Sequence, residues 1–238
     1  MGESQDILVS VEPSGLALVT LNRPAKRNAV SLAMWGRLGE IFSELGARED
    51  VRAVILTGAG GHFSAGADIS EFSSLRADSQ SGRAYEAANE GATLALRDCR
   101  KPTIAAVSGY GMGGGCALAL ACDLRVGDAT TRMGIPAARL GVVYGELDCS
   151  LLYRQVGLAN AKRVLYSGRA FDAPECAAIG LIDILRPQPR STRRGRWRPR
   201  SSTTRRCRLL APSSCSERWH QDRPRHVTPR FPPLSSAP

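Results

Sequence analysis

The sequence lacks the features of a secreted or membrane-spanning protein. Its first ten residues, MGESQDILVS, contain no basic region followed by an apolar stretch, which is the pattern of a secretory signal. No apolar run approaches the roughly 18–20 residues that a membrane-spanning helix needs. These absences predict a cytoplasmic protein that has no membrane partner.

The cysteines do not form a metal-binding or disulfide pattern. There are seven, an odd number, and no two of them are spaced as CxxC. No group of histidines and cysteines has the spacing of a zinc site. We therefore expect reduced thiols and no bound metal.

Positive charge is concentrated at one end of the chain. Residues 186–238 hold fourteen of the 32 basic residues and two of the 22 acidic ones, which gives this segment +12 and leaves −2 for residues 1–185. The segment is rich in Arg, Pro and Ser and has neither helical nor strand periodicity, which predicts a disordered tail. One interpretation is a nucleic-acid-binding arm. We favour out-of-frame translation, because aromatic and basic residues do not alternate as in such arms.

Residues 1–185 alternate between strand and helix patterns. Two short apolar runs around Pro13–Gly15 predict a hairpin, and Ser31 is placed to cap a helix that ends near Leu45. Continuous apolar runs predict buried strands, and periodic segments predict helices. The strands are expected at 51–58, 103–109 and 123–128. The helices are expected at about 80–98, after the glycine run through Cys122, and at 151–157, 159–168 and 173–180. This alternation predicts an α/β layer architecture.

A glycine-rich segment, SGYGMGGGCALALACDLRV at residues 108–126, precedes an apolar helix and suggests close approach to a ligand. No GxxxxGK[ST] sequence is present, which excludes a P-loop. Gly109, Gly111 and Gly114 match GxGxxG, but no acidic residue ends the next strand where a dinucleotide site needs one. A second loop of small residues, HFSAGADIS at 62–70, also follows a buried strand. Backbone N–H groups of the two loops can converge on one carbonyl oxygen, as in an oxyanion hole.

Five segments, in this order, carry a family resemblance: NRPAKRNAVS, AVILTGAGGHFSAGADI, KPTIAAVSGYGMGGGCALALACDLRV, IPAARLGVV and SGRAFDAPECAAIGLID. Together they resemble the crotonase (enoyl-CoA hydratase/isomerase) superfamily over about residues 7–185. The resemblance implies a ClpP/crotonase-like spiral of ββα units, with an acyl-CoA-binding core at 1–185. It also implies a coenzyme A thioester as substrate, no further cofactor, and homotrimers or hexamers.

The resemblance also assigns roles to particular residues. The backbone N–H groups of Ala67 and Gly114 would form the oxyanion hole, and Asp68 would fix the first loop, a role close to that of an Asx-type turn residue. Arg23, Ala25 and Lys26 would line the coenzyme A nucleotide site, where a cation can face phosphate. The alternative for the two cations is a solvated basic loop. The other residues assigned to the thioester site are Ala65, Gly66, Ile69 and Gly113.

The chain departs from the family's hydratase pattern at two positions. Ala117 stands where that pattern has a glutamate after the glycines, and Ala137 stands where it has a glutamate after proline. Alanine cannot transfer a proton, so we expect little hydration of an enoyl thioester. The segment YGELD offers Glu146 first, and then Asp148 and Tyr144, as replacement acid/base groups. The alternative is that Glu146 and Asp148 only stabilise the start of the next helix.

The sequence therefore predicts an acyl-CoA-binding protein of fatty acid metabolism, of the enoyl-CoA hydratase type but without its usual glutamates. An isomerase-type enzyme using Glu146 is one alternative, and a non-catalytic thioester binder is another. The resemblance further implies C-terminal helices that complete the acyl pocket, and residues 186–238 carry no such pattern. If those helices are absent, apolar surface is expected to be exposed.

Overall fold

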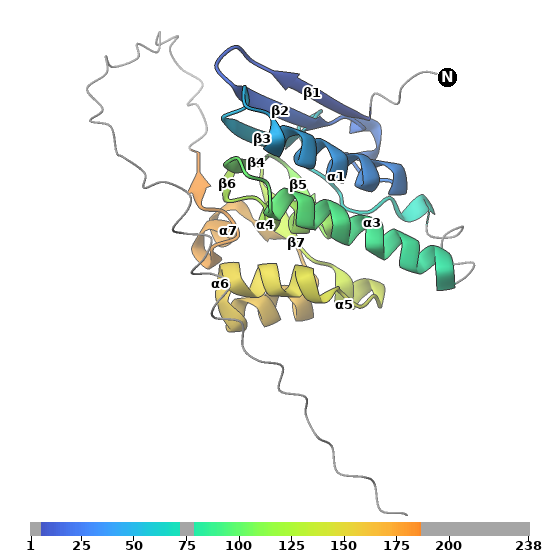
Figure 1. Cartoon of the computed structure of the whole chain (residues 1–238). Coiled ribbons are helices and arrows are strands. Elements are labelled where there is room, and N and C mark those ends of the chain that lie inside the picture. The colour runs from blue at the N-terminus through green and yellow to red at the C-terminus, as the bar shows by residue number, and fades with distance from the viewer. Residues whose placement is uncertain (1–5, 72–78, 187–238) are drawn as a thin grey trace, which may run out of the picture. The chain divides into compact units, whose positions relative to one another are not determined.

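The first third of the described chain forms a hairpin, a capped helix and a parallel strand, as the sequence predicts. The computed structural model describes residues 6–71 and 79–186, all of them within a unit that spans 1–190 (Figure 1). Residues 187–238 lie outside the described ranges, so the predictions about the basic tail stay predictions. Strands β1 (Ile7–Val11) and β2 (Leu16–Leu21) pair antiparallel. The Ser31 hydroxyl then accepts a hydrogen bond from the Met34 N–H and caps α1 (Leu32–Ala47).

A six-stranded sheet forms the larger layer of the fold, in the order β1-β2-β3-β4-β6-β9. The β1–β2 pair is antiparallel and the other pairs are parallel. The strands after β2 are β3 (Ala53–Gly58), β4 (Thr103–Val107), β6 (Leu124–Gly127) and β9 (Ile184–Leu185). Most of these strands lie far apart in the sequence, so the sheet brings distant loops to the same edge.

Helices α1 and α3 (Ser79–Arg97) pack side by side over one face of this sheet (Figure 1). Strand residues alternate between this face and solvent, so that Val19 of β2 is buried while Leu18 is exposed. The buried strand residues and the apolar residues of α1, Trp35 among them, belong to one hydrophobic core.

A three-stranded sheet of order β5-β7-β8 forms the smaller layer, from β5 (Tyr110–Met112), β7 (Arg132–Gly134) and β8 (Phe171–Asp172). The chain passes from a strand of the large sheet to a strand of the small one and then to a helix, as in β4-β5-α4 and β6-β7-α5. Helix α4 (Gly114–Ala121) is apolar on every side and is buried from Gly115 onward. A helix that is apolar all round is typical of the interior of a protein.

The remaining helices are α5 (Ala137–Leu140), α6 (Glu146–Ser167) and α7 (Ala173–Ile179), with 3₁₀ turns η1 (Pro24–Lys26) and η2 (Ile69–Glu71). The sequence predicts two short helices where the structure has α6. Gly157 marks the junction, because its φ of 75° and ψ of 165° interrupt the helical backbone there. Gly168 and Gly180 end α6 and α7 in the left-handed conformation, as expected of helix stops.

Candidate functional site

The small-residue loop at 62–68 is held between two other backbone segments. The Ser64 N–H donates to Tyr110 O at 2.8 Å, and the Met112 N–H donates back to Ser64 O at 2.9 Å. On the other side, the Val30 N–H donates to Gly66 O at 2.8 Å, and the Asp68 N–H donates to Val30 O at 2.9 Å. These bonds fix the loop against β5 and against the segment that precedes α1.

Glycine is required where this loop meets the start of α4. Gly66 has a φ of 96°, and a Cβ on it would stand 2.6 Å from Met112 O and 3.2 Å from Gly114 N. A Cβ on Gly115 would stand 2.7 Å from Ser64 Cβ. The two backbones therefore approach more closely than side chains allow.

This close approach brings together the two N–H groups predicted from the sequence. The Ala67 nitrogen lies 3.7 Å from the point where a Cβ on Gly114 would stand. Within residues 6–71 and 79–186, neither the Ala67 N–H nor the Gly114 N–H donates to another backbone group. Both residues are partly exposed, and Gly114 is the first residue of α4, where N–H groups have no partner inside the helix. Both N–H groups therefore lie at partly exposed positions without a backbone acceptor in the described ranges.

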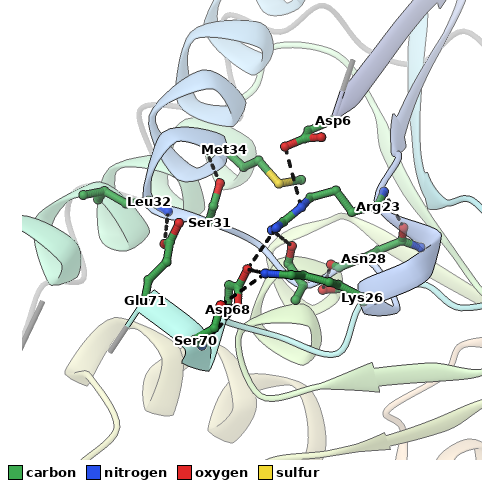
Figure 2. Close-up of polar contacts among 12 residues, drawn as sticks. Asp6, Arg23, Lys26, Asn28, Ser31, Leu32, Met34, Asp68, Ser70 and Glu71 are labelled. Atoms are coloured by element: carbon green, nitrogen blue, oxygen red, sulfur yellow. Dashed lines mark hydrogen bonds and ion pairs between the residues drawn. The ribbon is translucent and has the colours of Figure 1, made fainter. Parts of the chain in front are cut away.

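A buried carboxylate with two cations anchors the same loop from the other side (Figure 2). Asp68 Oδ2 lies 3.0 Å from Arg23 Nη2 and 2.9 Å from Lys26 Nζ, and the Asp68 side chain is only 5% exposed. Burial alone would raise the pKa of Asp68. Hydrogen bonds from Ser70, Lys26 and Arg23 outweigh burial and hold that pKa well below its ordinary value.

Asp68 also forms the Asx-type turn that the sequence suggests, because its Oδ1 accepts from the Ser70 N–H at 3.1 Å. The two cations are thus paired with Asp68 and are not simply part of a solvated loop. The Lys26 side chain is half exposed, whereas the Arg23 side chain is 17% exposed and lies between Asp68 and Asp6 (Figure 2).

Asn28 is a structural residue of the site that the sequence analysis missed. It is fully buried, with a φ of 57°. Its side chain accepts from the Arg23 N–H and donates to the carbonyls of Ala59 and His62 at 2.8 and 2.6 Å. Asparagine tolerates the left-handed region better than most residues, and an Asn in a loop of this kind is the signal that could have identified it.

The two carboxylates of the segment YGELD differ in burial. Asp148 is buried, and burial together with the nearby Glu90 carboxylate raises its pKa to about 6. Glu146 is exposed. Both lie in the first turn of α6, where the alternative from the sequence places them, although the N-cap is Gly145 and neither carboxylate makes a capping hydrogen bond. The sequence favours Glu146 as the first candidate, whereas burial distinguishes Asp148.

The two positions where the family pattern has glutamates carry no ionisable group in this chain. Ala117 and Ala137 are both buried, so the positions where the resemblance expects glutamates are apolar.

No group of three or more His, Cys, Asp and Glu side chains suited to a metal ion occurs in the described ranges. No helix described in the structure has the length and apolar character needed to cross a membrane.

The other residues predicted for the site are placed as follows. Gly113, the N-cap of α4, has a φ of 53° and is partly exposed. Ala25, Ala65 and Ile69 are exposed and lie on the segments that carry Lys26, Gly66 and Asp68. His62 Nδ1 accepts from the Tyr110 N–H at 3.2 Å and the two rings stack, so this histidine has a structural role in the loop.

Comparison with known proteins gives consistent matches. The family model described as enoyl-CoA hydratase/isomerase matches residues 11–197. YngF of Bacillus subtilis (strain 168), whose name places it with the enoyl-CoA hydratases/isomerases, is 39% identical over 186 residues, which are 77% of this chain and 69% of YngF. The short-chain-enoyl-CoA hydratase of Clostridium acetobutylicum is 36% identical over 177 residues, which are 74% of this chain and 67% of that protein.

The same similarity holds for solved structures. An enoyl-CoA hydratase/carnithine racemase from Magnetospirillum magneticum superposes with a TM-score of 0.73 and 38% identity, covering 76% of this chain and 67% of that one. Enoyl-CoA hydratase from Bacillus anthracis gives a TM-score of 0.73 and 31% identity, covering 77% of this chain and 70% of that one. The chain spans about two thirds of the length of the curated relatives it matches, 69% of one and 63% of another.

Proposed function

The chain belongs to the enoyl-CoA hydratase/isomerase family, and on that premise we propose that it binds an acyl-CoA thioester and stabilises its enolate. The observation that carries this proposal is the approach of the Ala67 and Gly114 N–H groups, from two separate loops, without backbone acceptors of their own in the described ranges. Two converging donors match the needs of a carbonyl oxygen that gains negative charge. The α4 helix dipole adds to this stabilisation, because Gly114 lies at its positive end.

Asp148 is the group we assign to proton transfer. Its pKa of about 6 places it near neutrality, where a carboxyl group both removes and returns a proton efficiently. The carboxylate takes a proton from a carbon next to the thioester, and the electron pair moves to the oxygen held by Ala67 and Gly114. Asp148 then returns the proton to another carbon of the same conjugated system. This sequence is an isomerisation, and it uses one carboxyl group.

Hydration is less well supported by the residues present. Adding water needs one group to accept a proton from the water and another to protonate carbon. Ala117 and Ala137 are buried and have no ionisable group. The names of the relatives favour hydration, so both reactions belong in the test. A non-catalytic thioester binder is the second candidate, favoured by the same two alanines.

The cations near Asp68 are proposed to face the nucleotide part of the ligand. Lys26 is half exposed at the outer side of its ion pair, so it can also contact a phosphate. A role in fatty acid metabolism, a cytoplasmic location and a homotrimeric or hexameric assembly are proposed from the family. Analytical ultracentrifugation of the full chain tests the assembly.

The test combines binding and turnover. Calorimetry with butyryl-CoA should show saturable binding, and free butyrate should show none. Turnover of a 3-enoyl-CoA to a 2-enoyl-CoA should exceed hydration of crotonyl-CoA. Asp148→Asn should abolish the isomerisation, whereas the matched variant Glu146→Gln should retain it. Brisk hydration by the wild type, or full activity of Asp148→Asn, would overturn this mechanism, and binding without any turnover would favour the non-catalytic binder.

A further inference from the structure

The hydroxyl of Tyr144 is buried and has no hydrogen-bond partner within the described part of the chain. Tyr144 lies between α5 and α6, in the segment that also carries Asp148. A buried polar group without a partner destabilises a protein, and most such groups in folded proteins are paired. An unpaired hydroxyl in this position therefore suggests a partner that arrives with the ligand.

The hydroxyl is also close to the proposed thioester site. It lies 3.8 Å from the point where a Cβ on Gly113 would stand, and Gly113 directly precedes the Gly114 N–H. The Trp35 ring lies against the next residue, because a Cβ on Gly114 would stand 3.0 Å from Trp35 Cζ2. The Tyr144 hydroxyl, from the segment between α5 and α6, therefore lies near Gly113, and the Trp35 ring of α1 lies near Gly114.

The protonation state of Tyr144 restricts what the hydroxyl can do. Burial raises its pKa well above the ordinary value, and nearby Cys116 and Asp148 act in the same direction. The phenol therefore stays neutral near pH 7, so it serves as a hydrogen-bond donor and not as a base.

We propose that Tyr144 is a specificity-determining residue whose hydroxyl donates a hydrogen bond to an oxygen on the acyl group of the bound thioester. This inference rests on the proposed function. On that function, the Ala67 and Gly114 N–H groups take up the two lone pairs of the thioester carbonyl oxygen. On the same function the acyl chain passes Asp148, so the phenol of Tyr144, four residues before it, finds its acceptor on that chain. The site therefore prefers an acyl group that carries its own oxygen over a plain alkyl chain.

A comparison of two thioesters with two proteins tests this preference. Wild-type protein should bind 3-hydroxybutyryl-CoA about three- to tenfold more tightly than butyryl-CoA in calorimetry, which corresponds to one net hydrogen bond. Tyr144→Phe should bind both equally, because it lacks only the hydroxyl. The matched control is Tyr153→Phe, which removes an exposed hydroxyl on α6 and should keep the wild-type preference.

A second measurement separates a ligand-binding role from a structural one. The hydroxyl has no protein partner in the described ranges, so ligand-free Tyr144→Phe should unfold at the wild-type temperature or above it. A clear drop in melting temperature, or equal binding of both thioesters by the wild type, would overturn the inference and leave the proposed function intact. Failure of the wild type to bind either thioester would overturn both.

Discussion

The Asp68 carboxylate lies 3.0 Å from the Arg23 guanidinium, and this pair ties the loop that carries the Ala67 N–H to the segment before α1. Asp68 also accepts from Lys26, so one buried carboxylate orders two segments that are 42 residues apart. The position of the Ala67 N–H therefore depends on an electrostatic contact outside the glycine-rich segment.

Asp68→Asn should destabilise the protein by about 1.5–3 kcal/mol at pH 7, because it removes charge-assisted hydrogen bonds from a buried position. The pKa of Asp68 is lowered in the folded state, so its contribution is present above the pKa of the unfolded chain, about 4, and is lost as the pH falls further. Urea unfolding at pH 7 and pH 3 measures this. Asp50→Asn, at an exposed ion pair with Arg48, should change little, and an equal loss in both variants would contradict the prediction.

Asp148→Asn should have the opposite effect on stability. The folded-state pKa of Asp148 is raised to about 6, so keeping it ionised costs free energy above that pH. The variant should be more stable than the wild type by up to about 3 kcal/mol at pH 8, and the gain should vanish below about pH 4. Chemical denaturation at the two pH values measures the difference. A variant less stable than the wild type at pH 8 would show that the carboxylate is favourably paired.

The pH dependence of turnover should follow the same group. If Asp148 acts as the carboxylate, kcat/KM for the isomerisation should fall below about pH 6, with one protonation controlling the acid limb. A stopped assay across pH 5 to 9 gives the profile. A limb centred well below pH 6 would contradict the assignment to Asp148, and Glu146→Gln would then be the next variant to assay.

Gly66→Ala should lose thioester binding and stability together, because the added Cβ would stand 2.6 Å from Met112 O at a φ of 96°. We expect a loss of more than about 2 kcal/mol in the free energy of unfolding. Gly36→Ala is the control, since Gly36 is an exposed position in α1 where a Cβ meets nothing within 4 Å. That variant should be neutral or gain up to about 1 kcal/mol. Thermal unfolding and calorimetry with butyryl-CoA report both quantities.

Local sequence signals predicted the hairpin, three strands of the large sheet and the longer helices, but none of the three strands of the small sheet. The Ser31 cap, the hairpin turn at Gly15 and the helix stops at Gly168 and Gly180 each follow from backbone chemistry within a few residues. The two small-residue loops were also recognisable, because only small residues allow backbones to approach so closely. The role of Asn28 was not recognised, since its partners Ala59 and His62 lie more than thirty residues away.

The sequence by itself determined the family, the two loops that supply Ala67 and Gly114, and the alanines at 117 and 137. Only the tertiary structure decided which carboxylate of YGELD is buried. Glu146 and Asp148 are two residues apart on a helix, so they project about 200° apart, and one of them must face away from any given neighbour. The packing of α6 against α4 and α5 turns Asp148 inward and Glu146 toward solvent, and no local pattern in the sequence encodes that rotation.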